Sequence, residues 1–199
     1  MSVLNVKQKR LVKRLIRNKT SKISKSSVKI GIISDSHTKT NYAIKAIDML
    51  LDQGAEFFIH AGDIVEEQTL EYLEKIGKRY VAVYGNNDAH LVNVHNQYNL
   101  VQEPYYFKLA NTSFKLMHLP FYMSNDTDIV IFGHTHDFSV EYKGETLYLN
   151  SGEVCARSKP LSECVLLKIT PKNFDVKYFT RKKKEEDFQL ENKFSFERD

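Results

Sequence analysis

Few residues of the kinds that mark secreted or membrane proteins are present. The 199-residue chain has two cysteines, Cys155 and Cys164, too few for a disulfide framework, and a reducing, cytoplasmic compartment is favoured. No apolar run approaches the ~20 residues that cross a bilayer, so we expect no membrane span. The length allows one domain with a sizeable core but not two ordinary ones.

Acidic residues are missing from the start of the chain. Residues 1–29 contain ten Lys or Arg and no Asp or Glu, and because the whole chain carries +4, residues 30–199 carry −6. The basic character therefore belongs to the N-terminal extension, and we do not expect the folded domain to bind nucleic acid.

Residues 1–27 read as a basic N-terminal extension. Apolar residues at roughly helical spacing in 4–18 predict a basic amphipathic helix, and residues 19–27 a polar linker. Lys13 and Arg14 interrupt its apolar stretch, which argues against a secretory signal. A transit peptide, a helix packed on the domain or a partner, and a solvated arm are the alternatives.

Strands and helices alternate after the extension. Val28–Ser34, Phe57–His60 and Tyr80–Tyr84 are short apolar runs that predict strands. Between them, Asn41–Gln53 and Glu67–Ile76 have a helical apolar period, and a glycine follows each. This alternation predicts parallel pairing with right-handed crossovers.

Strands joined by short turns fill the rest of the domain, which predicts antiparallel pairing there. The expected strands are Tyr105–Leu109, Phe114–Met117, Asp128–Phe132, Phe138–Tyr142, Thr146–Leu149, Cys164–Ile169 and Phe174–Phe179. We therefore expect an α/β fold, a two-sheet sandwich with flanking helices over residues 28–180. Residues 181–199 are highly charged and predict a C-terminal tail, helical or loose.

Polar residues that can bind metals follow five of the expected strands. They are Asp35 and His37, Asp63, Asn86, His118, and His134 and His136. Because the carboxyl ends of strands in an α/β sheet converge on one edge, we expect these side chains to meet there. The two pairs are spaced two residues apart, so both members can face one metal region.

The mixture of ligand types limits the choice of ion. Imidazole, carboxylate and amide oxygen together suit a borderline divalent cation better than Ca²⁺ or a cysteine-rich structural zinc site. We expect Mn²⁺, with Zn²⁺, Fe²⁺ or Ni²⁺ as alternatives. Any one of these histidines alone would more often be an ordinary core or surface residue, and it is the ordered set that points to a metal centre.

In order, D-x-H, GD, GN-x-D, H and GHTH resemble the calcineurin-like metallophosphoesterase superfamily, and more narrowly its small single-domain YfcE-like phosphodiesterases. The similarity runs from about Val28 to Phe179. It includes Asn150-Ser151-Gly152, which is similar to the family's N-P-G-S turn, with Arg157 just beyond. The resemblance implies a metallophosphoesterase sandwich and hydrolysis of phosphoesters, phosphodiesters foremost, by a water that two metal ions activate.

The resemblance also implies a role for each residue. Asp35, His37 and His136 would hold one ion, Asn86, His118 and His134 the other, and Asp63 would bridge both. Asp63, Asn86 and His118 are the expected catalytic residues. Asp88 would hold a ligand or loop in place, or simply cap a turn.

Three features depart from the family pattern. Asn87 stands where many members have a proton-donating His, and a neutral amide cannot act as a general acid. Leu119 follows His118 where a glycine is usual. Nine residues separate His118 from Asp128, where family members usually carry a longer, often helical insertion.

Two other classes of function compete with the enzyme. A catalytically weak or silent protein-interaction scaffold has a precedent in the retromer subunit of this fold, but such a scaffold predicts eroded ligands, whereas Asp63 and Asn86 are present. A nuclease with a basic arm would need a basic and aromatic strip that the acidic domain lacks. The expected partner is a phosphoester substrate, and a homo-oligomer is possible.

Overall fold

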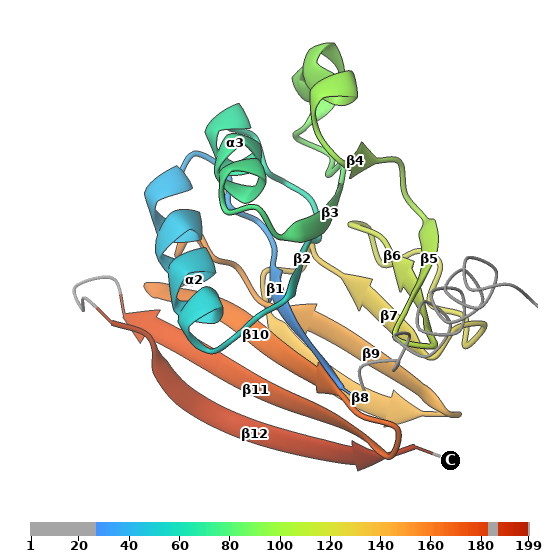
Figure 1. The fold of residues 1–199 in the computed structure, drawn as a ribbon. Helices are drawn as coiled ribbons and strands as arrows, with labels where there is room; N and C mark the ends of the chain where they lie inside the picture. Colours follow the sequence, from blue (N-terminus) through green and yellow to red (C-terminus); the bar gives the residue numbers. More distant parts are fainter. Residues whose placement is uncertain (1–26, 183–186, 199) are drawn as a thin grey trace, which may run out of the picture.

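The computed structural model describes residues 27–182 and 187–198, and it forms two sheets packed face to face (Figure 1). The larger sheet contains, in spatial order, β12 (Gln189–Glu197), β11 (Asn173–Lys182), β10 (Leu161–Ile169), β1 (Val28–Ile33), β2 (Phe57–His60), β3 (Arg79–Val83) and β4 (Leu100–Val101). The smaller contains β5 (Tyr105–Leu109), β6 (Thr112–Leu116), β7 (Ile129–Phe132), β9 (Thr146–Ser151) and β8 (Phe138–Lys143). The expected α/β sandwich is confirmed.

The first part of the domain folds as the alternation predicts. Strands β1, β2 and β3 pair in parallel, and the helices α2 (Thr40–Asp52) and α3 (Glu67–Lys75) connect them. Both helices lie on the outer face of the larger sheet (Figure 1), where Leu50 and Leu70 share a buried cluster with Phe58 of β2. The short strand β4 and the 3-10 helix η1 (Ala89–Gln97) were not expected.

The antiparallel prediction for the second part is only partly right. Neighbours joined by tight turns are antiparallel, as in β5–β6, β8–β9 and β10–β11. However, β6–β7 and β7–β9 pair in parallel. Residues 119–127 carry the chain from the end of β6 back to the start of β7, and β8 does the same between β7 and β9, so these connections act as crossovers.

The expected C-terminal tail was wrong, because residues 189–197 form β12 along the edge of the larger sheet. Phe194 and Phe196 pack against the core between the sheets, and they alternate with polar residues at the period of a strand. The high charge of this segment lies on the exposed edge and face of β12, where charge also discourages edge-to-edge association. The predicted helix in 4–18 lies outside the described residues.

The core between the sheets is apolar and regular. Ile30, Ile32, Phe114, Leu147 and Val165 are fully buried there, from strands of both sheets. No helix in the described part of the chain has the length and apolar character to cross a membrane. This core fixes the strands whose carboxyl ends carry the polar residues described next.

Candidate metal centre

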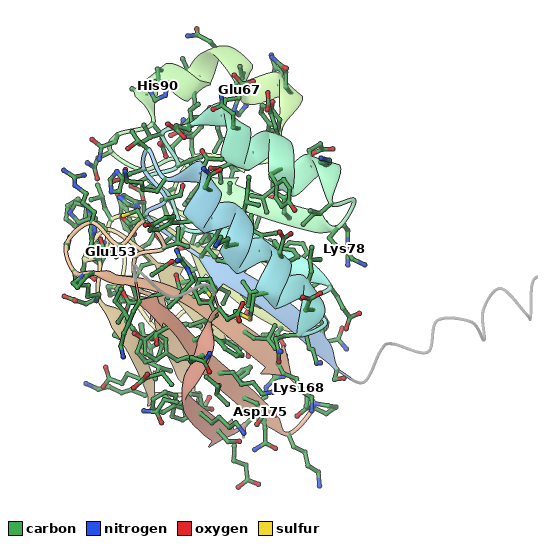
Figure 2. The ribbon with its side chains drawn as sticks, turned by 90° about the vertical axis from the view of Figure 1, so that its left-hand side faces the viewer. Glu67, Lys78, His90, Glu153, Lys168 and Asp175 are labelled. Atoms are coloured by element: carbon green, nitrogen blue, oxygen red, sulfur yellow. The ribbon has the colours of Figure 1, made fainter. Side chains whose placement is uncertain are left out.

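All seven predicted ligands lie at one edge of the sandwich, in the loops that follow β1, β2, β3, β6 and β7. In Figure 2, Lys78 marks the side where β3 begins, and Glu153 lies on the opposite side among the loops of this edge. Asp35, His37, Asp63 and His118 are buried, and Asn86, His134 and His136 are more exposed. The edge therefore combines buried and solvent-exposed potential ligands.

One group of donors surrounds Asp35. The Nε2 atom of His136 lies 3.4 Å from Asp35 Oδ1, and the rings of His37 and His136 stack with centroids 5.3 Å apart. Nε2 of His37 lies 3.8 Å from Asp63 Oδ2. These four residues are the predicted ligands of the first ion, and we call them centre one.

A second group surrounds Asn86. Its Oδ1 atom lies 3.1 Å from His118 Nε2 and 3.0 Å from His134 Nδ1. His118 Nε2 also lies 3.4 Å from Asp63 Oδ1. We call these residues, again with Asp63, centre two. The two oxygens of Asp63 thus face different groups of potential metal ligands.

The donors fit divalent ions. Two ligand atoms that each lie about 2.0–2.2 Å from one ion are about 3–4 Å from each other, and the donor pairs above have this spacing. Two buried atoms that could bind a metal, Asp35 Oδ1 and His37 Nε2, have no hydrogen-bond partner in the described structure. Since an unpaired buried polar atom is costly, these two atoms are poised for an ion.

The backbone at this edge is strained. Five of the seven predicted ligands have positive φ angles, between 44° and 69°: Asp35, His37, Asp63, His134 and His136. Such conformations cost a residue other than glycine about 1–3 kcal/mol each, and they cluster at functional sites. Close packing adds a second constraint, because a Cβ atom on Gly85 would lie 2.2 Å from the backbone nitrogen of Asp63.

Asn87 and Asp88 hold this backbone in place. Asn87 donates to both oxygens of Asp63, from its backbone amide at 2.9 Å and from its side-chain Nδ2 at 2.7 Å. The carboxylate of Asp88 accepts from the backbone amides of Ile64, Val65 and Gly85. Asp88 therefore joins two ligand loops and does more than cap its own turn.

Electrostatics at the edge keep the shared carboxylate charged. Burial would raise the pKa of Asp63, but hydrogen bonds from His118 and Asn87 outweigh it and hold that pKa well below its ordinary value. Burial would likewise lower the pKa of His118, yet the hydrogen bond to Asp63 and the charge of Asp35 raise it. His60, buried behind the site, has its pKa lowered to about 3 by burial and stays neutral.

Two acidic residues of the site were missed by the sequence analysis. Glu103 accepts hydrogen bonds from the backbone amides of His118 and of Leu119, the latter at 2.9 Å, and so fixes the turn where the family has glycine. Glu153 accepts from the ring of His136 at 2.5 Å. Neither lies in a ligand motif, although Glu153 directly follows the Asn150-Ser151-Gly152 turn.

The short connection after His118 is held by a buried lysine. Lys115 donates from its Nζ atom to the carbonyls of Tyr122 and Ser124, each at 3.1 Å, and pairs with Asp126. Residues 119–127 contain no helix, and they expose Phe121, three residues after His118, with 74% of its surface accessible. The usual helical insertion is thus replaced by a tethered loop.

Comparison with known proteins agrees with this fold. The family model of the calcineurin-like phosphoesterase superfamily domain matches residues 28–172. The chain is 30% identical over 141 residues to phosphodiesterase MJ0936 of Methanocaldococcus jannaschii, covering 64% of this chain and 85% of that protein. It is 22% identical over 148 residues to phosphodiesterase YfcE of Escherichia coli K12, covering 64% of this chain and 79% of YfcE.

Solved structures share the fold at lower identity. Vps29 of Entamoeba histolytica complexed with Zn²⁺ superposes with a TM-score of 0.62 at 16% identity, covering 85% of this chain and 99% of that one. At such identity the likeness concerns the fold alone, whereas the family match spans most of the chain. The chain therefore belongs to the calcineurin-like phosphoesterase superfamily.

Proposed function

We propose that this protein hydrolyses phosphoesters, phosphodiesters foremost, with two divalent ions held by the seven ligands of centres one and two. The observation that carries the proposal is the shared carboxylate, since Asp63 directs Oδ1 toward His118 and Oδ2 toward His37. When bound, such a pair of ions supplies a nucleophilic water at neutral pH and neutralises the charge of the phosphoryl oxygens.

The residues of this chain would divide the work as follows. Asp63 holds the two centres in register, and its position is fixed by the two hydrogen bonds from Asn87. Asn86 contributes an amide oxygen without adding negative charge opposite an anionic substrate. His118 keeps its Nε2 toward the site because Nδ1 donates to the carbonyl of Ala61 at 2.8 Å.

Proton donation to the leaving group would not come from Asn87. Its side-chain amide is engaged with Asp63, and an amide has no proton to give at neutral pH. Substrates whose leaving group is stable as an anion should therefore react fastest. Mn²⁺ is the ion that we propose for the working enzyme, and the Zn²⁺ of the Entamoeba structure makes zinc the first alternative.

The experiment is a metal-reconstitution assay. Full-length protein is stripped of metal, loaded with Mn²⁺ or Zn²⁺, and assayed on bis(p-nitrophenyl) phosphate and p-nitrophenyl phosphate. We expect two ions per chain and diester hydrolysis that disappears with the metal. Bound metal without turnover of either ester would favour the scaffold reading over the enzyme.

A further inference from the structure

A buried carboxylate lies behind centre one, on the side of His136 that faces away from Asp35. Glu153 is fully buried and follows the Asn150-Ser151-Gly152 turn. It occupies the position of the serine in the N-P-G-S turn that this segment resembles. Burial of a carboxylate at this position requires donors, and the structure supplies several.

The donors come from the following loop and from the metal centre. The backbone amides of Ser158 and Lys159 donate to Glu153 Oε1 at 2.7 and 3.0 Å. The thiol of Cys155 donates to Oε2 at 3.5 Å. Oε2 also accepts from the backbone amide of Ser158, at 3.1 Å, and from Nδ1 of His136, at 2.5 Å. The carboxylate is thus held from its own loop and directs one oxygen at the imidazole.

The other nitrogen of the same ring faces centre one. Nε2 of His136 lies 3.4 Å from Asp35 Oδ1, an oxygen without a hydrogen-bond partner in the described structure. A carboxylate that accepts the Nδ1 proton leaves the lone pair on Nε2, directed at the space beside Asp35. Carboxylate–histidine–metal arrangements of this kind fix the tautomer and orientation of the ligand.

We propose that Glu153 is a positioning residue for centre one, which holds His136 as its Nδ1–H tautomer and strengthens binding of that ion. This inference rests on the proposed function for the presence of the ion, but not for the tautomer. His118 in centre two has a backbone carbonyl, that of Ala61, in the corresponding place. The two centres therefore differ, with an ionised acceptor behind one ligand and a neutral acceptor behind the other.

The first test uses metal-free full-length protein, so it is independent of activity. Long-range ¹H–¹⁵N spectra at pH 8 report which nitrogen of His136 carries the proton. We expect Nδ1–H in the wild type and Nε2–H in Glu153→Gln, because the backbone amides of Ser158 and Lys159 keep the amide oxygen at the Oε1 position and turn the NH₂ group toward Nδ1. A wild-type Nε2–H tautomer, or Nδ1–H in Glu153→Gln, would overturn the proposal.

The second test is calorimetric titration with Zn²⁺. Loss of a partner that orients a metal ligand typically weakens binding by about 10–100-fold. We expect Glu153→Ala to weaken one of two ions by this factor, Glu153→Gln to weaken it at least as much, and neither to alter the other ion. Lys159→Ala is the matched control, because its side chain pairs with Asp137 and Glu163 and not with His136, and the substitution keeps the backbone amide that donates to Glu153.

Outcomes of the titration separate the two proposals. If the wild type binds no ion while the tautomer result holds, the proposed function fails and the positioning role survives. If a folded Glu153→Ala binds both ions as the wild type does, the positioning role fails. Should Glu153→Ala not fold, Glu153→Ser, which restores the residue of the family turn, takes its place in the titration with the same expected direction.

Discussion

The interior between the two sheets and the edge at the strand ends are built in opposite ways. The interior is apolar and regular, with fully buried side chains such as Ile32 and Leu147. The edge buries polar side chains such as Asp35 and His118, and five predicted ligands have positive φ angles. The apolar core thus lies in one region and the proposed chemistry in the other, which agrees with the general tendency of strain to gather at functional sites.

We expect the largest effect from removing Asp63, the carboxylate that we propose binds both ions. Asp63→Ala removes one donor from each centre, so both ions should be lost or weakened. Since losing an outer partner of a ligand already costs about 10–100-fold, we expect diesterase activity to fall by more than about 100-fold. A diester assay measures the fall in activity, and metal analysis after gel filtration counts the ions that remain bound. Asp48→Ala, on the exposed face of α2, is the control for loss of a carboxylate. Two ions retained by Asp63→Ala would refute the bridging role.

A substitution in the core between the sheets should instead lower stability and leave metal binding unchanged. Phe174 is buried in the inter-sheet core near the start of β1, at the far end of the strands from the ligands. Phe174→Ala should lower the free energy of unfolding by about 3–5 kcal/mol, through lost burial and a residual cavity. Denaturant unfolding measures this change, and metal stoichiometry at 10 °C should stay at the wild-type value. A variant that loses metal while folded would show that the two regions are not independent.

The third change addresses the missing proton donor. Asn87→His should speed hydrolysis of alkyl esters by up to about 100-fold, because positioned acid catalysis contributes about 10²–10⁴-fold and acts on poor leaving groups. Nitrophenyl esters should change little. A plot of log rate against leaving-group pKa with saturating Mn²⁺ compares the two proteins. A flat wild-type plot, with chemistry rate-limiting, would mean that another residue donates the proton.

Acidification should weaken centre two by up to about tenfold per pH unit, because metal must displace one proton from His118. The pKa of His118 is raised in the metal-free chain, so this competition begins above the ordinary histidine value of about 6.5. The sign for stability is opposite. Protonated His118 stabilises the metal-free fold below about pH 6.5, and this contribution is lost as the pH rises through the raised pKa. Metal titrations and thermal midpoints between pH 6 and 8 test both trends.

The smallest expected effect is that of removing the basic extension. Residues 1–27 precede β1 and contribute no predicted ligand. A chain that starts at Ser27 should keep the thermal midpoint and the turnover of the full protein. Loss of either quantity would place the extension against the domain and would contradict the separation of roles drawn above.

Local sequence signals explain what could be predicted. The sequences of β1, β2 and β3 are apolar, and polar residues follow each one directly. Both the strands and the edge that carries the predicted ligands could therefore be predicted from the sequence. Glu103 and Glu153 could not be found in this way, since their partners His118 and His136 are 15 and 17 residues away. Only the folded chain brings such pairs together.

Pairing in the second part of the domain was harder for the same reason. A tight turn predicts an antiparallel neighbour, but the parallel pair β7–β9 depends on β8 lying at the edge of the sheet. In the last strand, charge hid the alternation of Phe194 and Phe196. Net charge describes solvation of one face, and it does not exclude a strand whose other face is buried.

Anomalous diffraction from crystals grown with Mn²⁺ would show directly whether two ions bind at centres one and two. We expect two peaks per chain, about 3.5–4 Å apart, with Asp63 bound to both ions. Asp35, His37 and His136 should complete one coordination sphere, and Asn86, His118 and His134 the other. A single peak, or two peaks of which only one contacts Asp63, would contradict the proposal that Asp63 joins two ions.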